Sequence, residues 1–180
     1  MPTGSRKCLA LAVTAIILHI ILIPAFVLVF MRVRTPKVRF EHLTVEVVTL
    51  NSTTSTQPSL SMRLNAQVTV KNTNFGEFKF SESAISIVYR GNVAGSGVIP
   101  GSGVGARSTK KLNVTVDVES KKDPFWGRDL NSGRVTVSSH ARVEGRVRLF
   151  MIVRKKRTGS MNCTMDVDTR TRTVANLNCK

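Results

Sequence analysis

The most regular pattern in the chain is a strict alternation of apolar and polar residues. Even positions are apolar and odd positions polar from residue 60 to residue 71. This period of two is typical of a half-buried β-strand. Less regular alternations predict further strands at residues 85–89, 112–118, 135–153 and 163–167, and Phe40, Val45 and Val47 suggest an early one.

Turn residues separate these strands, for example at residues 72–74 and 91–92. Residues 123–131 form the one helical pattern in this part of the chain, with Asp123 as N-cap and Pro124 at the first helical position. The run 135–153 is too long for one flat strand, so we expect a bulge or bend at Gly145. About seven strands and one short helix predict an all-β fold, an antiparallel sandwich.

A different pattern precedes the strands, because residues 9–31 contain no charged side chain. As a helix this run is about 34 Å long, which is enough to cross a hydrocarbon core of about 30 Å. A cleavable signal would have a shorter apolar region and a small-residue cleavage site. We therefore expect a retained transmembrane signal-anchor.

These patterns divide the chain into four segments. Residues 1–8 form a short basic tail, 9–31 the membrane helix, 32–37 a basic juxtamembrane linker and 38–180 the β-sandwich domain. Six of the 27 basic residues and none of the 11 acidic ones precede residue 41, so the remaining 140 residues carry a formal charge of about +10. Such a charge favours polyanionic partners, although many basic proteins are merely soluble.

The densest basic run is Arg154, Lys155, Lys156 and Arg157, which follows Arg142, Arg146 and Arg148. A solvated hairpin turn is the usual explanation of such a run. Contact with an anionic lipid headgroup or a cell-wall polyanion is the alternative. Nucleic acid is not expected as a partner, because no stacking aromatic residues are interleaved with the run.

The three cysteines suggest covalent modifications rather than catalysis. Cys8 adjoins the membrane helix, where a thiol can be S-palmitoylated or remain inert. Cys163 and Cys179 can pair in an extracytoplasmic domain, and two reduced cysteines are the alternative. The sequons at Asn51, Asn113 and Asn162 are candidate N-glycosylation sites.

Signatures of an enzyme are missing from the sequence. The motifs HExxH, CxxC and GxSxG do not occur, and His19, His42 and His140 lack a metal-ligand spacing. Residues 101–106 satisfy a relaxed G-x-G-x-x-A pattern, but a predicted strand follows it where a dinucleotide site needs a helix. We therefore expect no catalytic residue, no metal and no cofactor.

The order of the motifs resembles a plant family, the group-2 late-embryogenesis-abundant proteins, and within it the membrane-anchored harpin-induced-like branch. The matching segments are VTVKNTNFGEFKF at residues 68–80, SAISIVYRGNVAGSGVIP at 83–100, LNVTVDV at 112–118 and MNCTMDV…NLNC at 161–179. Many members read Asn-Pro-Asn where this chain has Asn72-Thr73-Asn74. The resemblance implies a fibronectin-III-like sandwich, displayed from a plant membrane and linked to stress or defence rather than catalysis.

We therefore expect a non-enzymatic, single-pass plasma-membrane protein, with a cytosolic N-terminus and an extracytoplasmic β domain that binds an unidentified protein partner. An endomembrane location and a lipid-binding module at a membrane surface are the alternatives. The flanking charges oppose this orientation, since Arg6 and Lys7 precede the span whereas four basic residues follow it. Long domains translocate largely regardless of charge, and the sequons, the cysteine pair and the resemblance favour an outside domain.

Overall fold

The computed structural model describes residues 3–30, 32–51, 59–119, 124–149 and 153–179. These residues divide into two compact units, one before Arg34 and one from Arg34 onwards. The first unit is the helix α1 (Thr3–Phe30). Its segment Lys7–Leu28 is long and apolar enough to cross a membrane. A membrane anchor and a signal sequence both have this length and composition.

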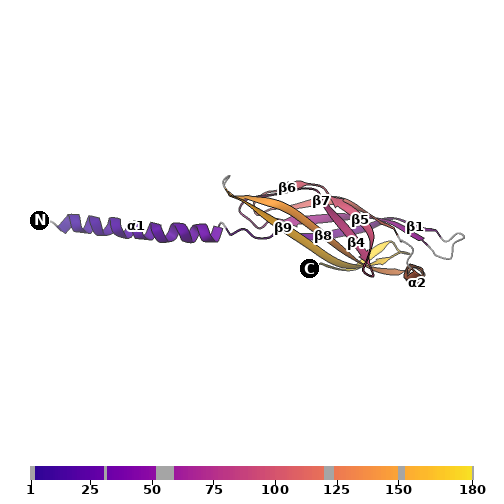
Figure 1. Cartoon of the computed structure of the whole chain (residues 1–180). Helices are drawn as coiled ribbons and strands as arrows, with labels where there is room; N and C mark the ends of the chain where they lie inside the picture. The colour runs from indigo at the N-terminus through magenta and orange to yellow at the C-terminus, as the bar shows by residue number, and fades with distance from the viewer. Residues whose placement is uncertain (1–2, 31, 52–58, 120–123, 150–152, 180) are drawn as a thin grey trace. The chain divides into compact units, whose positions relative to one another are not determined.

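The second unit is an antiparallel β domain with one short helix, which confirms the predicted all-β class (Figure 1). In its described part the elements are β1 (Lys37–Asn51), β2 (Ser59–Lys71), β3 (Glu77–Phe80), β4 (Ser83–Tyr89), β5 (Asn92–Ile99), β6 (Ser102–Val104), β7 (Thr109–Glu119), α2 (Pro124–Ser132), β8 (Arg134–Leu149), β9 (Val153–Asp168) and β10 (Thr173–Cys179). The helix α2 matches the predicted one, whose N-cap Asp123 lies outside the described residues.

The strands belong to one continuous sheet that nearly closes into a barrel. The order β1-β2-β7-β5-β4 leads to the long strand β8, whose other edge pairs with β9. At the far side of β9, a Cβ atom on Gly159 would lie 2.9 Å from the Pro36 carbonyl oxygen, so the segment that leads into β1 lies against β9. The two ends of the sheet therefore approach each other around a common interior.

Strand β2 shows why the sequence folds this way. Met62, Leu64, Ala66, Val68 and Val70 are buried, whereas Arg63 and Asn65 between them are exposed, as the alternation predicts. Strand β1 buries Val38, Phe40 and Val45 despite an irregular pattern, because its register with β2 shifts after Phe40 and again after Val45. Each shift changes which face the next residues occupy.

Strand β8 exchanges one neighbour for another along its length. Its first half pairs with β4 up to Ala141, and its second half pairs with β3 from Gly145 onwards. The predicted bulge at Gly145 is wrong, since β8 stays in continuous register with β9. The glycine is needed for space: a Cβ there would lie 2.6 Å from the Phe78 ring and 2.4 Å from the Lys79 carbonyl oxygen. Gly145 thus lets β3 lie directly beside β8.

Two buried asparagines form hydrogen bonds that hold together the end of the domain near Arg34, where the domain begins. The Asn72 amide group donates to the carbonyl oxygens of Gly76 at 2.7 Å, Gly105 at 2.9 Å and Val104 at 3.1 Å. Its side-chain oxygen accepts from both the backbone and the side-chain nitrogen of Asn74. We call these two residues the asparagine cluster.

Asn74 extends the asparagine cluster to the linker. Its side chain donates to the Arg34 carbonyl oxygen at 2.8 Å and accepts from the Arg34 amide. Both asparagines are nearly fully buried, so these hydrogen bonds replace water for groups that would otherwise be costly to bury.

At the opposite end of the domain lies α2, which contacts β8 and β2 and reaches the last residue of β4 through Trp126 (Figure 1). The rings of Tyr89 and Trp126 stack with centroids 4.0 Å apart, and the Tyr89 hydroxyl donates to Asp129 at 2.6 Å. Burial, assisted by the Asp129 carboxylate, raises the pKa of Tyr89 to about 12.

Candidate functional site

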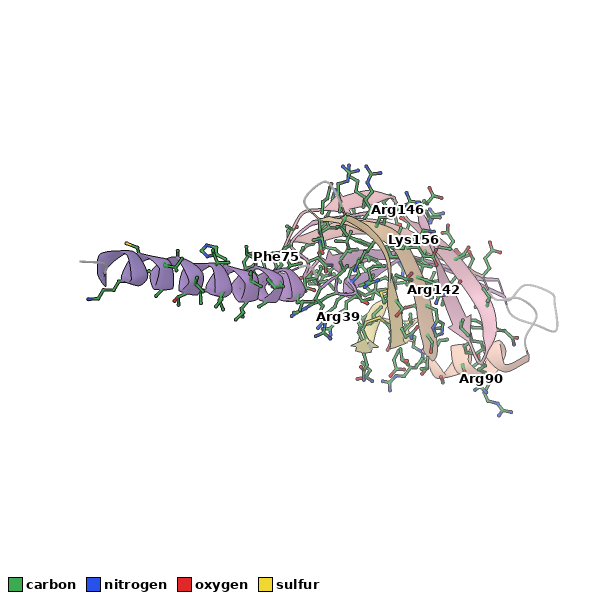
Figure 2. All side chains as sticks on the ribbon, turned by 60° about the vertical axis from the view of Figure 1, so that its left-hand side comes forward. Arg39, Phe75, Arg90, Arg142, Arg146 and Lys156 are labelled. Carbon is green, nitrogen blue, oxygen red and sulfur yellow. A yellow bond between two sulfur atoms is a disulfide. The ribbon has the colours of Figure 1, made fainter. Side chains whose placement is uncertain are left out.

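A set of basic side chains shares the outer face of three neighbouring strands, β3, β8 and β9. We call it the basic strand face, and it consists of Lys79, Arg142, Arg146, Arg148, Arg154 and Lys156. Residues directly opposite each other in an antiparallel pair point to the same face. Figure 2 shows Arg142, Arg146 and Lys156 on one side of the domain, away from Arg90 near α2.

The cations form rows that cross the strands. Lys79 lies opposite Arg146, and Arg146 lies opposite Lys156, so three positive charges stand side by side. Neighbouring strands are about 4.8 Å apart, which brings such side chains within reach of one ligand. In the next row Arg148 and Arg154 are opposite each other.

Few carboxylates balance these charges. Glu77 and Glu144 share the face with the six cations, which leaves a formal charge of +4. Within the described part of the domain, the one ion pair on this face joins Lys79 Nζ to Glu77 Oε2 at 3.7 Å. The four charged side chains of Arg146, Arg148, Arg154 and Lys156 are exposed and have no carboxylate within ion-pair distance there.

The basic strand face is hollowed rather than flat. A depression of about 540 Å³ is lined by the side chains of Lys79, Arg146 and Lys156, with Glu144 and the backbone of Gly145 also contributing. Concave basic surfaces concentrate anions, because low-dielectric walls focus the field. Phe80 also lines the depression but is only 6 % exposed, which leaves little of its ring available for stacking.

The predicted basic run at residues 154–157 does not form a hairpin turn. It lies in strand β9 and pairs with β8, so the interpretation as a turn is wrong. The period of two divides it: Arg154 and Lys156 belong to the basic strand face, whereas Lys155 and Arg157 lie in the alternate register. Arg157 is half-buried and its guanidinium donates to the Lys156 carbonyl oxygen at 3.0 Å.

The cysteines behave as the sequence predicts where the structure describes them. Cys163 and Cys179 are directly opposed in the β9–β10 pair and form a disulfide. The reduced alternative is therefore not observed. Cys8 is a free, exposed cysteine on α1, and whether it carries a lipid stays a prediction.

The asparagines of the three sequons lie on strands. Asn113 and Asn162 are exposed on β7 and β9, in positions that a glycan could reach. Asn162 Oδ1 lies 2.9 Å from the Nδ1 atom of His140, and Asn113 Oδ1 accepts a long hydrogen bond from Gln67. Asn51 ends β1, and its side chain lies outside the described part. Use of these sites stays a prediction.

The other candidate groups have structural explanations. No cluster of His, Cys, Asp and Glu that could hold a metal is found among the described residues. Asp166 accepts from the Thr136 hydroxyl and the Asn176 amide, which lower the pKa of its carboxyl. Backbone amides at Thr171 and Arg170 lower the pKa of Asp168. In the glycine-rich segment, residues 102–104 form β6 and the chain continues into β7.

Sequence reasoning missed two features of this region. Lys79 joins the basic strand face only because β3 pairs with β8, and strand pairing of this kind is not visible in a local pattern. Where the asparagine cluster lies, the sequence pattern predicts only a turn. The available signal was two asparagines two residues apart, between strands and followed two residues later by a glycine.

Three comparisons place this chain among known proteins. Residues 67–165 match the model of the family LEA_2, described as late embryogenesis abundant protein. A late embryogenesis abundant protein of Arabidopsis thaliana is 29% identical over 181 residues, covering 97% of this chain and 83% of the relative.

Solved structures give weaker matches. A crystal structure of a protein from Archaeoglobus fulgidus has 11% identity and a TM-score of 0.42 over 72% of this chain and 97% of its own. The solution structure of a protein assigned to the late embryogenesis abundant group has 15% identity and a TM-score of 0.35, over 93% and 92% of the two chains.

Proposed function

Because this chain belongs to the LEA_2 family of late embryogenesis abundant proteins, we propose that it is a non-enzymatic, single-pass membrane protein that presents its basic β domain as a stress-related interaction module. Family membership suggests the stress-related role. The harpin-induced-like branch and its link to defence are part of the proposal, supported by the order of the sequence motifs.

The observation that carries the proposal is the combination of two units in one chain. The segment Lys7–Leu28 has the length and composition of a membrane span, and the unit that follows it carries a concentrated, unbalanced basic face. The helix exposes large apolar side chains such as Leu11, Ile20 and Leu28, and a helix that is apolar all round is typical of a membrane span. The helix thus serves as the anchor and the basic strand face as the interacting surface.

We further propose that the β domain lies on the extracytoplasmic side of the plasma membrane. The disulfide between Cys163 and Cys179 supports this orientation, since such bonds persist in oxidising compartments and are rare in the cytosol. The exposed sequons at Asn113 and Asn162 are compatible with it. The basic residues after the span argue for the opposite orientation, so the experiment must decide between the two.

A lipid-binding module is the rival function. An acyl chain would have to enter between strands whose inner side chains are 0 % exposed, including Phe78, Ile85 and Met161. Inserting it would require displacing a close-packed core. The geometry therefore favours a module that binds through its surface.

Protease protection on sealed microsomes tests the proposal. We expect the β domain of the full chain to resist protease until detergent is added, and mass spectrometry of unreduced, alkylated protein to find Cys163 and Cys179 blocked from alkylation. Digestion of the domain in intact vesicles would contradict the outside orientation. Recovery of the protein from membranes by carbonate washing would contradict the anchor.

A further inference from the structure

We propose that the basic strand face is a binding site for a linear acidic polysaccharide, one whose sugars carry carboxylates. This inference rests on the proposed extracytoplasmic position of the β domain. It names the class of partner that the interaction module would bind.

The first step is the availability of the charges. Arg146, Arg148, Arg154 and Lys156 are exposed, and no described carboxylate lies within ion-pair distance of them. A second group of exposed cations, Lys37 and Arg39 on β1 and Lys71 on β2, is also without a described carboxylate at ion-pair distance, but it has no row of three cations, since Lys71 lies opposite Lys37 on one side and Thr109 on the other. The four cations of the basic strand face are therefore available to bind an anionic ligand.

The second step is the arrangement of the charges in rows. Lys79, Arg146 and Lys156 succeed one another across three strands, so their spacing repeats with the strand spacing of about 4.8 Å. One pleat further along the strands Arg148 and Arg154 add two cations, in a row whose β3 member is Glu77. A ligand that matches such rows must itself repeat its negative charges along a line.

The third step is the shape of the surface. The side chains of the first row line a depression of about 540 Å³ with Gly145 among its lining residues. A polymer one sugar wide can lie in this depression and contact all three cations, whereas a bilayer surface would contact its rim. The geometry thus favours a chain-like polyanion over a membrane.

The fourth step is the chemistry of the charged groups. Arginine guanidinium groups bind carboxylates with two parallel hydrogen bonds, and lysines supply point charges beside them. Binding of single-stranded nucleic acid would need exposed aromatic rings for its bases, and Phe80 is buried. Carboxylate-bearing polysaccharide is the polyanion that fits this face of an extracytoplasmic domain.

The experiment uses the full chain in nanodiscs of neutral phosphatidylcholine, with oligogalacturonate as the probe and isothermal titration calorimetry as the readout. The test variant combines Lys79→Gln, Arg146→Gln and Lys156→Gln. A matched control removes three exposed cations from β1 and β2, with Lys37→Gln, Arg39→Gln and Lys71→Gln. Fully methyl-esterified oligogalacturonate is the uncharged control probe.

We expect the test variant to bind oligogalacturonate about 10- to 100-fold more weakly, a loss of about 1.4–2.8 kcal/mol over the three charge contacts that it removes. The control variant should keep its affinity within about threefold. Binding should weaken as salt shortens the Debye length from about 30 Å at 0.01 M to about 8 Å at 0.15 M. The esterified probe should not bind.

Equal weakening in the two triple variants would overturn the inference, since binding would then follow net charge rather than this face. Absence of oligogalacturonate binding by the unmodified chain would overturn it as well. These results do not depend on topology. A domain that binds the probe but is digested in intact microsomes would contradict the proposed function and leave the site intact.

Discussion

Replacing Asn72 by alanine should destabilise the β domain more than any exposed substitution, because one side chain holds three segments together. Its amide has two N–H groups shared among three carbonyl oxygens at 2.7–3.1 Å, and its oxygen accepts two hydrogen bonds from Asn74. At about 1 kcal/mol for each of roughly four hydrogen bonds, Asn72→Ala should cost about 3–5 kcal/mol. A domain of this size is typically stable by about 5–15 kcal/mol, so the loss is a large fraction.

Urea unfolding of the full chain in detergent measures this change. The single tryptophan, Trp126, is buried at the end of the domain opposite to the asparagine cluster, so its fluorescence reports global unfolding. The matched control is Asn113→Ala, which removes an exposed amide and should change stability by less than about 0.5 kcal/mol. Equal midpoints for the two variants would show that the buried hydrogen bonds of Asn72 are energetically unimportant and would refute the reasoning.

Three further predictions follow from single residues. Tyr89 is the one tyrosine, so the ultraviolet absorbance of tyrosinate should titrate near pH 12, and a titration near pH 10 would contradict its buried hydrogen bond. Because the pKa of Tyr89 in the folded protein is raised above the ordinary value of about 10, the stabilisation that it gives is present below pH 10 and is lost as the pH rises towards 12. Val68→Asp should unfold the domain because Val68 is 0 % exposed, whereas Thr69→Asp should be nearly neutral because Thr69 is half-buried on the outer face. Thermal melts of both variants would check this. Thr73→Pro should raise the unfolding free energy by about 0.4–1 kcal/mol by restricting the unfolded chain, and a lower urea midpoint would show that the native turn cannot hold proline.

The sequence predicts those parts of the fold in which local pattern and burial agree. The alternation in β2 and β4 places their buried residues correctly, because both strands have one face on the core along their whole length. The pattern does not predict strands β5 and β6, because Gly95 and Gly97 interrupt the alternation in β5 and Gly103 interrupts it in β6. In β5 those glycines allow close approach to β7, where a Cβ on Gly95 would lie 2.5 Å from the Asp117 carbonyl oxygen.

The candidate site was predictable in composition but not in arrangement. The basic run at residues 154–157 is plain in the sequence, yet only half of it faces the same side as Arg146 and Arg148. Lys79 is 67 residues away from Arg146 and reaches it because Gly145 admits the Phe78 ring beneath β3. Pairings between strands so far apart depend on the whole sheet, which is why a local pattern cannot supply them.

The same arrangement leads to a last prediction, which concerns the stability of the free protein. Arg146 has a cation directly opposite it on each side, and like charges in such positions destabilise a sheet by about 0.2–1 kcal/mol. Arg146→Gln should therefore raise the urea midpoint at low salt, by a free energy of up to about 1 kcal/mol. The gain should shrink at 0.5 M salt, since screening relieves the same repulsion in the unmodified protein.

The control for Arg146→Gln is Arg63→Gln. Arg63 donates to Asp117 at 2.8 Å, so removing its charge should give no gain in stability at either salt concentration. If Arg146→Gln lowers the midpoint, then contacts of the arginine stem outweigh the repulsion and the row is a stabilising feature of the sheet. If it raises the midpoint while weakening oligogalacturonate binding, the protein keeps a row of mutually repelling cations whose repulsion a bound anion reduces. Such a cost in stability is expected where a residue serves binding.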